Sequence, residues 1–199
     1  MSPSHVLEPT YQTIKVRLME GAWPLGARLE ATKLADDLGV SMTPVRDSLN
    51  RLVGERLVDL RAGGGFQVAR FNELTLRDMF EFNATLLIFA VLTARPQGVR
   101  AGPKGRAEYV HRCANLFESI AVGCGNRAVT EAVRALNDRL HATRRLDPHM
   151  FGDAPAELER LETDISKGAS SEHVREHLIA FHDRRKEAAS HYIRLLEQG

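Results

Sequence analysis

The sequence has little of what marks membrane, secreted or strongly basic proteins. Its 199 residues carry a net charge of only +1, so bulk charge does not predict a nucleic-acid partner. The most apolar run, TLLIFAVLTA at 85–94, is too short to cross a bilayer. The first ten residues, MSPSHVLEPT, lack the basic start and apolar core of a signal peptide. Two cysteines without a CxxC spacing, Cys113 and Cys124, suit a reducing compartment. We therefore expect a cytoplasmic chain with no membrane partner.

Motifs of the common catalytic sites are missing too. The chain contains no nucleophile elbow, Walker loop or dinucleotide fingerprint. The glycine run AGGGF at 62–66 lacks the strand–loop–helix context of a phosphate cradle. The sequence therefore predicts a protein that is not an enzyme and uses no cofactor.

The hydrophobic pattern predicts a mainly α protein whose character changes near residues 69–74. We expect two domains, at 1–72 and 73–199. In the first, apolar spacing and breaker residues predict helices at 11–20, 30–39 and about 41–55, then a β-hairpin over 56–71 with three glycines at its tip. In the second, they predict an antiparallel α-helical bundle. Its helices are expected from Thr75, with Asp78 as a capping-box partner, to before Pro96, and at about 107–122, 127–146, 155–167 and 171–197.

The stretch GVSMTPVRDSL at 39–49 starts a short helix abruptly after a two-residue turn. Two short helices joined in this way form a helix-turn-helix, whose second helix lies in the major groove of DNA. Ser41 is suited to cap this helix and Pro44 to occupy its first turn, which leaves the positive end of the helix dipole facing phosphate. Thr43 can donate to a phosphate, and Arg46 is long enough to reach a base edge, most often guanine. The glycine-tipped hairpin then supplies a wing.

The segment LEATKLADDLGVSMTPVRDSLNRLVGERLVDLRAGGGFQVARF resembles the winged helix-turn-helix of the GntR family of bacterial transcription regulators. The resemblance covers roughly residues 10–71 and implies DNA binding. Met42 and Thr32 stand where the family commonly has arginine, and because each change removes a phosphate or base contact, we expect weaker or altered binding. The resemblance places the predicted DNA interface at Thr32, Ser41, Met42, Thr43, Pro44 and Arg46, with the wing at Gly63 and Gly64.

After this head, the helical part resembles the FadR-type effector domain, often called FCD. The resemblance rests on LTLRDMFEFNATLLIFAVLTA, LFESIAVGCGNRAVTEAVRALNDRL and ELERLETDISKGASSEHVREHLIAFH. In that family a helical bundle encloses a pocket, and many members hold a divalent metal through one Asp and three His. Cys113, Phe117 and Leu158 fall on three of these positions, and only His182 keeps a ligand. The loop at 95–108 also looks shortened. We therefore expect no divalent metal of the family type.

The predicted effector pocket combines apolar and polar positions. Asn83 and Leu87 fall where the family's junction helix carries an Arg and a Glu. The replacements predict an apolar interior that holds a hydrophobic or amphipathic effector, or that is filled by its own side chains. Among the polar candidates, Arg134 can hold a carboxylate effector, although a surface ion pair is the commoner role of such a residue. The predicted lining is Asn83, Leu87, Cys113, Phe117, Arg134, Asn137, Leu158 and His182.

These features favour an effector-responsive homodimer, a repressor as is usual in the family, that binds a palindromic double-stranded DNA operator. The apolar segment LLIFAVL at 86–92 is a candidate for the dimer interface. Two other hypotheses stay open. His173 and His177 lie one helical turn apart, a metal-capable spacing on which a metal-dependent enzyme could be built, although no HExxH motif accompanies them. The chain could also be a DNA-binding dimer whose effector site has degenerated.

Overall fold

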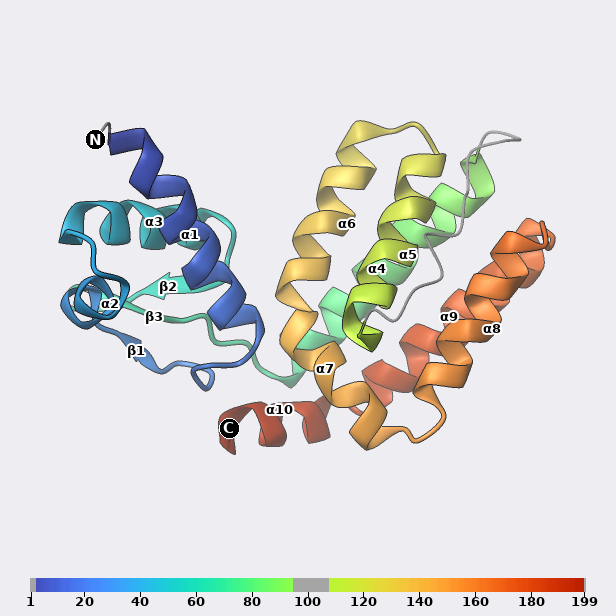
Figure 1. The fold of residues 1–199 in the computed structure, drawn as a ribbon. Helices are drawn as coiled ribbons and strands as arrows, with labels where there is room; N and C mark the ends of the chain where they lie inside the picture. The colour runs from blue at the N-terminus through green and yellow to red at the C-terminus, as the bar shows by residue number, and fades with distance from the viewer. Residues whose placement is uncertain (1–2, 95–107, 199) are drawn as a thin grey trace. The chain divides into compact units, whose positions relative to one another are not determined.

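A computed structural model describes residues 3–94 and 108–198 of the chain. The described chain divides into two compact units (Figure 1). The N-terminal unit runs to Phe71 and includes the residues from Arg194 onward, and the helical unit runs from Asn72 to Ile193. The glycine- and proline-rich loop expected at 95–108 lies outside the described residues except for Glu108.

The N-terminal unit is a winged helix-turn-helix, as the sequence predicts. Its elements are α1 (Pro3–Met19), β1 (Arg28–Leu29), α2 (Ala31–Leu38), α3 (Met42–Gly54), β2 (Val58–Leu60) and β3 (Phe66–Val68). The strands form an antiparallel sheet in the order β1-β3-β2, with Val58 opposite Val68 and Leu60 opposite Phe66. The hairpin of β2 and β3 confirms the predicted wing. The strand β1 was not predicted, because two residues are too short to show alternation.

Apolar residues at helical spacing form the core of this unit. Apolar residues of α1 and α3 pack against each other, and residues of α2 and the sheet complete the cluster. Gly39 ends α2 with φ 64°, the left-handed conformation that favours glycine. Arg56, just beyond α3, also has a left-handed backbone conformation, with φ 59°. The most buried members of the core are Tyr11, Ile14, Leu29, Val45, Leu49, Leu52 and Val58.

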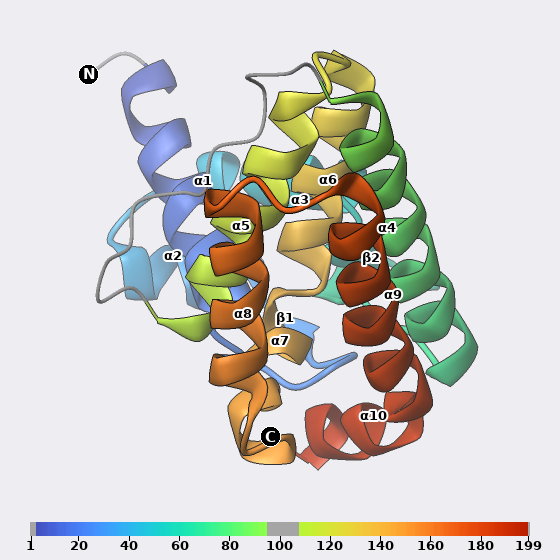
Figure 2. The same cartoon turned by 90° about the vertical axis from the view of Figure 1, so that its right-hand side faces the viewer.

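The second unit is an all-helical bundle, which confirms the predicted mainly α fold class. Its elements are α4 (Glu73–Thr93), α5 (Tyr109–Gly123), α6 (Arg127–Arg139), α7 (His141–Met150), α8 (Ala154–Ser166), α9 (Ser171–Glu187) and the first residues of α10 (Ala189–Gln198). Figure 2 shows α8 and α9 side by side as a helical hairpin, with α4 packed along α9. Apolar residues of α4, α5, α6, α8 and α9 form one continuous core.

Several expected helix boundaries are wrong. The helix α1 begins at Pro3 rather than at Tyr11. The helix α4 begins at Glu73 rather than Thr75, because Asn72 Oδ1 accepts the backbone N–H of Thr75 at 2.8 Å and caps it there. The helix expected at 127–146 is two helices that meet at Leu140, and the second continues to Met150. The helix expected at 171–197 is likewise divided, at Ala188. None of the helices in the described part of the chain is long and apolar enough to cross a membrane.

Candidate nucleic-acid interface and effector site

The N-terminal tip of α3 is exposed to solvent. Val45, Leu49 and Leu52 are fully buried and fix one face of α3 against the core. The opposite face and the tip therefore point into solvent. The residues exposed there are Ser41, Met42, Thr43 and Arg46, while Pro44 is half-buried.

Ser41 does not cap α3 in the way the sequence suggests. It occupies the N-cap position with extended backbone, φ −73° and ψ 164°, but its side chain forms no capping hydrogen bond. Pro44 lies in the first turn, where its missing N–H costs nothing. The Ser41 hydroxyl and the first N–H groups of α3 are consequently left for an outside acceptor, and phosphate oxygens are such acceptors.

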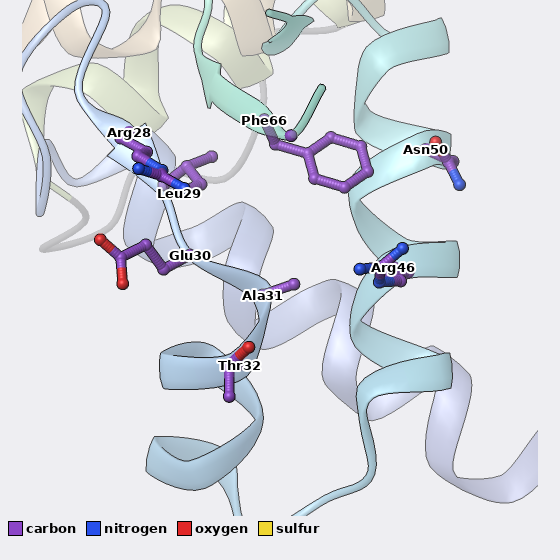
Figure 3. A pocket seen from close by; sticks show the side chains of 9 residues that line it. Arg28, Leu29, Glu30, Ala31, Thr32, Arg46, Asn50 and Phe66 are labelled. Carbon is purple, nitrogen blue, oxygen red and sulfur yellow. The ribbon is translucent and has the colours of Figure 1, made fainter. Parts of the chain in front are cut away.

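A cleft of about 390 Å³ lies beside this tip, between α3, the start of α2 and the sheet (Figure 3). Arg46 lines it from α3 and is exposed. Within residues 3–94 and 108–198, no acceptor bonds its guanidinium. The whole lining consists of Arg28, Leu29, Glu30, Ala31, Thr32, Arg46, Asn50, Gly65 and Phe66. The unpaired guanidinium of Arg46 at the edge of this cleft is long enough, and has enough N–H donors, to hydrogen-bond to a base edge.

Arg28 and Asn50 line this cleft but are absent from the predicted contacts. Asn50 follows Arg46 by one helical turn, so helical spacing alone is a signal that could have identified it. Arg28 lies on the two-residue strand β1, which leaves no pattern in the sequence. Both side chains are exposed, and both offer hydrogen-bond donors to a nucleic acid.

Thr32 and Met42, the two positions that lack the family's arginines, are neighbours in space. The Thr32 hydroxyl lies 3.8 Å from the Met42 sulfur. At these two positions the candidate interface carries a hydroxyl and a thioether in place of charged side chains. Apolar groups at such a position can contact a thymine methyl but cannot neutralise a phosphate.

The backbone conformation at the tip of the wing explains its three glycines. Gly63, Gly64 and Gly65 have φ of 90°, 96° and 90°, a region that other residues rarely adopt. A Cβ on any of them would meet no atom within 4 Å. The turn is closed by the N–H of Gly64 donating to Arg61 O at 3.0 Å. The tip is therefore a narrow, open ribbon with no side chains on its glycines.

In the helical unit, six predicted pocket residues are buried together. Asn83, Leu87, Cys113, Phe117, Leu158 and His182 come from α4, α5, α8 and α9 and are all fully or almost fully buried. The rings of Phe117 and His182 lie 5.5 Å apart, and His182 Nε2 lies 3.3 Å from Asn83 Oδ1. Asn137 is also buried and donates to Ala114 O at 3.0 Å.

Arg134 does not belong to this interior. Its side chain is 55% exposed and pairs with Glu118 on the surface, with Nη2 2.6 Å from the carboxylate. As a lining residue of the pocket, Arg134 is therefore a wrong prediction. The reason is that α6 turns Val133 and Asn137 inward, which leaves position 134 on the outer face.

The interior is not apolar, contrary to expectation. Arg144, Asp147 and Arg185 are buried within it, in addition to Asn83 and His182. Apolar side chains do form much of this interior, but α7 and α9 bring charged side chains into the same unit. Buried charges are rare unless paired, so the partners of these three groups decide their role.

Arg185 is fully partnered. Its Nε donates to Asp147 Oδ2 at 2.7 Å, and its Nη2 donates to Tyr109 and to Glu157, both at 2.9 Å. Asp147 also accepts the hydroxyl of Tyr192. Burial opposes the charge on Arg185, but these acidic partners outweigh it and raise its pKa. This network is complete without a ligand and reads as structural.

Arg144 differs from Arg185 in lacking a carboxylate partner. Its Nη1 donates to Asn137 Oδ1 at 2.7 Å, and its guanidinium lies 4.9 Å from the centre of the Phe117 ring. Its Nε and Nη2 are buried and find no acceptor among the described residues. Burial lowers the pKa of Arg144. Two guanidinium donors are thus available to an anion in the interior.

His182 is held as a neutral ring. Burial lowers its pKa to about 3, and its Nδ1 donates to Leu178 O at 2.7 Å. A neutral ring accepts at Nε2, so the Asn83 amide fits best with Nδ2 turned toward it, which leaves one polar end of Asn83 unpaired. Either orientation leaves Asn83 one hydrogen-bonding group for a ligand.

The donor set around His182 does not fit a divalent metal. The resemblance to the FadR-type domain puts Cys113, Phe117 and Leu158 at the three other ligand positions. Burial raises the pKa of the Cys113 thiol to about 12, so it stays protonated and binds metal poorly. Arg144 and Arg185 both lower the pKa of His182 by their charge. A single imidazole close to the positive charges of Arg144 and Arg185 is therefore a poor site for a divalent metal ion.

Known proteins match both parts of the chain. Residues 8–68 match the family model described as "Bacterial regulatory proteins, gntR family". Over 139 residues the chain is 27% identical to the HTH-type transcriptional regulator BphR of Paraburkholderia xenovorans, covering 70% of this chain and 54% of BphR. Over 148 residues it is 24% identical to the HTH-type transcriptional repressor GlaR of Escherichia coli, covering 64% of this chain and 67% of GlaR. The matched region thus spans about half the length of BphR.

A solved structure shares the overall fold. The crystal structure of a transcriptional regulator GntR from Rhodococcus sp. RHA1 matches with a TM-score of 0.76 at 15% identity, over 92% of this chain and 96% of that chain. At this identity the likeness concerns the fold alone. The match over residues 8–68 shows that the N-terminal unit contains a DNA-binding domain of the GntR family.

Proposed function

We propose that the chain acts in the cytoplasm as a homodimeric repressor that binds a palindromic operator and releases it in response to a small carboxylate. Residues 1–72 serve as the DNA-binding domain, and residues 73–199 serve as the effector-binding and dimerisation domain. The relatives are named transcriptional regulators, and one is named a repressor. The names of these relatives give no support to the alternative of a metal-dependent enzyme.

The observation that carries the proposal is the exposed Arg46 at the mouth of the α3 cleft, without an acceptor among the described residues. Arg46 reads a base edge, and Ser41 and Thr43 donate to flanking phosphates. Gly63 and Gly64 let the wing approach the backbone of the duplex closely. In a homodimer, two such heads bind half-sites roughly 34 Å apart, so the operator is palindromic.

An exposed apolar stripe on α4 supports dimerisation. Phe82, Phe89 and Leu92 are 52%, 46% and 57% exposed, and positions 82, 89 and 92 share one face of a helix. Leu87, Ala90 and Val91 face the core instead, so only part of the predicted LLIFAVL interface is available. In a two-fold symmetric dimer, this stripe would be buried against the same stripe of a second chain. A second copy of the chain is the simplest partner for a protein that binds a palindrome.

The buried polar groups of the helical domain indicate the class of effector. Arg144 offers two unpaired donors, and Asn83 offers one unpaired group. A carboxylate satisfies a guanidinium through two parallel hydrogen bonds, and Phe117 and Leu158 supply apolar walls for the rest of a small molecule. An effector that binds one dimer geometry better than another shifts the spacing of the two DNA-binding domains. That change in spacing alters the affinity for the operator.

Fluorescence anisotropy with the upstream intergenic DNA tests the proposal. We expect binding in the nanomolar-to-micromolar range with a steep dependence on salt. Arg46→Ala should weaken specific binding by about 1–3 kcal/mol, the value of one good base contact. Arg127→Ala is the matched control, since it removes an exposed arginine, paired with Glu131, from the helical domain. Equal binding by wild type and Arg46→Ala would refute the assigned interface.

A further inference from the structure

The hairpin of α8 and α9 carries a second group of polar side chains, separate from the interior around His182. His173 and His177 lie one turn apart on α9, and Asp164 lies opposite them on α8. One ligand atom from each of the three lies within 4.8 Å of the others. Sequence reasoning identified the two histidines but not Asp164, because its position depends on how the hairpin packs.

The distances in this group match those between the ligands of one metal ion. Asp164 Oδ2 lies 2.7 Å from His177 Nδ1 and 3.5 Å from His173 Nε2. In a tetrahedral zinc site with bonds of about 2.0 Å, neighbouring ligand atoms lie roughly 3.3 Å apart. Small side-chain rotations would bring the three atoms to that separation.

The Asp164 carboxylate is incompletely satisfied by hydrogen bonds among the described residues. Its Oδ2 is buried and has no hydrogen bond of acceptable geometry among the described residues, even though His177 Nδ1 approaches it closely. A buried carboxylate oxygen without a donor is costly. A cation between this oxygen and the two imidazole nitrogens would satisfy all three atoms.

We infer that Asp164, His173 and His177 bind a divalent transition metal ion, with Zn²⁺ the ion that the donor set fits best. Two imidazole nitrogens and one carboxylate oxygen are common zinc ligands, and a water completes the tetrahedron. That fourth position is open to solvent, because the side chains of His173 and His177 are 47% and 36% exposed. The site is independent of the DNA interface and of the carboxylate site beside Arg144.

Binding here would tie α8 to α9. The ligands come from the two arms of a hairpin whose turn covers residues 167–170, so the ion would bridge them near its closed end. An ion that binds only the folded hairpin adds its binding free energy to the stability of the fold. The expected role is therefore structural.

The test is a titration of the untagged full chain, treated with EDTA and kept reduced. Calorimetry with Zn²⁺ should give one ion per chain, and Co²⁺ should give a visible absorption spectrum of a tetrahedral nitrogen and oxygen site. His173→Ala, His177→Ala and Asp164→Asn should each weaken Zn²⁺ binding by about tenfold or more. Zn²⁺ should also raise the melting temperature of the wild type but not of His177→Ala.

The control is His149→Ala, which removes an exposed histidine on α7 outside the group. It should bind Zn²⁺ as tightly as the wild type. Circular dichroism checks that every variant keeps its helix content, and Asp164→Asn preserves side-chain shape if an alanine variant fails to fold. The inference is overturned if Zn²⁺ does not bind, if the three variants bind as well as the control, or if the Co²⁺ spectrum shows a thiolate ligand.

Discussion

The Thr32 hydroxyl and the Met42 sulfur lie 3.8 Å apart across the turn of the helix-turn-helix, so the two arginines typical of the family are missing from a single spot. Met42→Arg should restore one phosphate contact there. We expect tighter operator binding and a steepening of log K against log salt by about 0.9, the value of one neutralised phosphate.

Anisotropy titrations at several salt concentrations measure this slope. Thr32→Ala is the control, because it changes the same spot without adding charge. An unchanged slope in Met42→Arg, with binding otherwise intact, would show that position 42 does not face the DNA backbone.

A residue with left-handed backbone conformation caps α2 directly, and another lies just after the C-cap residue of α3. Gly39 has φ 64° and Arg56 has φ 59°, and a side chain in this region costs roughly 1–2 kcal/mol. Arg56→Gly should therefore raise the free energy of unfolding by about 1 kcal/mol, and Gly39→Ala should lower it by a similar amount. A Cβ at Gly39 would meet no atom within 4 Å, so the expected loss in Gly39→Ala comes from the backbone conformation and not from crowding.

Urea unfolding followed by circular dichroism measures both changes. The opposite signs form an internal control, since an effect of handling or of net charge alone would not reverse between the two variants. A destabilised Arg56→Gly would mean that the arginine side chain makes contacts that outweigh its backbone conformation.

Much of this fold follows from local patterns, but the interior of the helical unit does not. Some features depend only on residues that are close together in the sequence, so the sequence predicts them. Examples are the end of α2 at Gly39, the apolar spacing of α3 and the three glycines of the wing. Arg144 stands in the polar run ATRRLD, which gives no sign that it is buried while its neighbour Arg145 is exposed. The placement of Arg144, like that of Asp164, depends on packing between helices distant in the sequence.

Buried His182 and His141 make stability depend on pH. Burial lowers their pKa values from 6.5 to about 3 and about 4. Below pH 6.5 the unfolded chain binds protons that the folded chain does not, so the free energy of unfolding falls as the pH drops, and it is fully recovered above 6.5. For His182 alone, the loss between pH 6.5 and 5 is about 2 kcal/mol.

Urea unfolding at pH 7 and pH 5 checks this dependence. His182→Gln should lose less stability than the wild type over this interval, because glutamine does not titrate. His149→Ala removes an exposed histidine and should leave the dependence unchanged. Identical pH profiles for the wild type and His182→Gln would contradict a neutral, buried His182.

Arg144 and Arg134 provide a direct comparison for the effector proposal. Arg144 is buried with two donors unpaired, whereas Arg134 is paired with Glu118 on the surface. We expect small carboxylates such as acetate, succinate or benzoate to raise the melting temperature of the full chain, and the matching amides to have no effect. Arg144→Met should abolish the response, and Arg134→Met should preserve it.

The stability of the Arg144→Met variant without ligand separates binding from folding. Replacing a buried charge that lacks an ionic partner with an apolar side chain of similar volume is often neutral or stabilising, so this variant should fold at least as well as the wild type. Arg144→Lys keeps the charge but loses the two parallel donors, and it should bind carboxylates more weakly. If Arg144→Met still responds to the carboxylates, they bind elsewhere; if no carboxylate of several sizes stabilises the wild type, the interior is closed to anions and Arg144 serves packing alone.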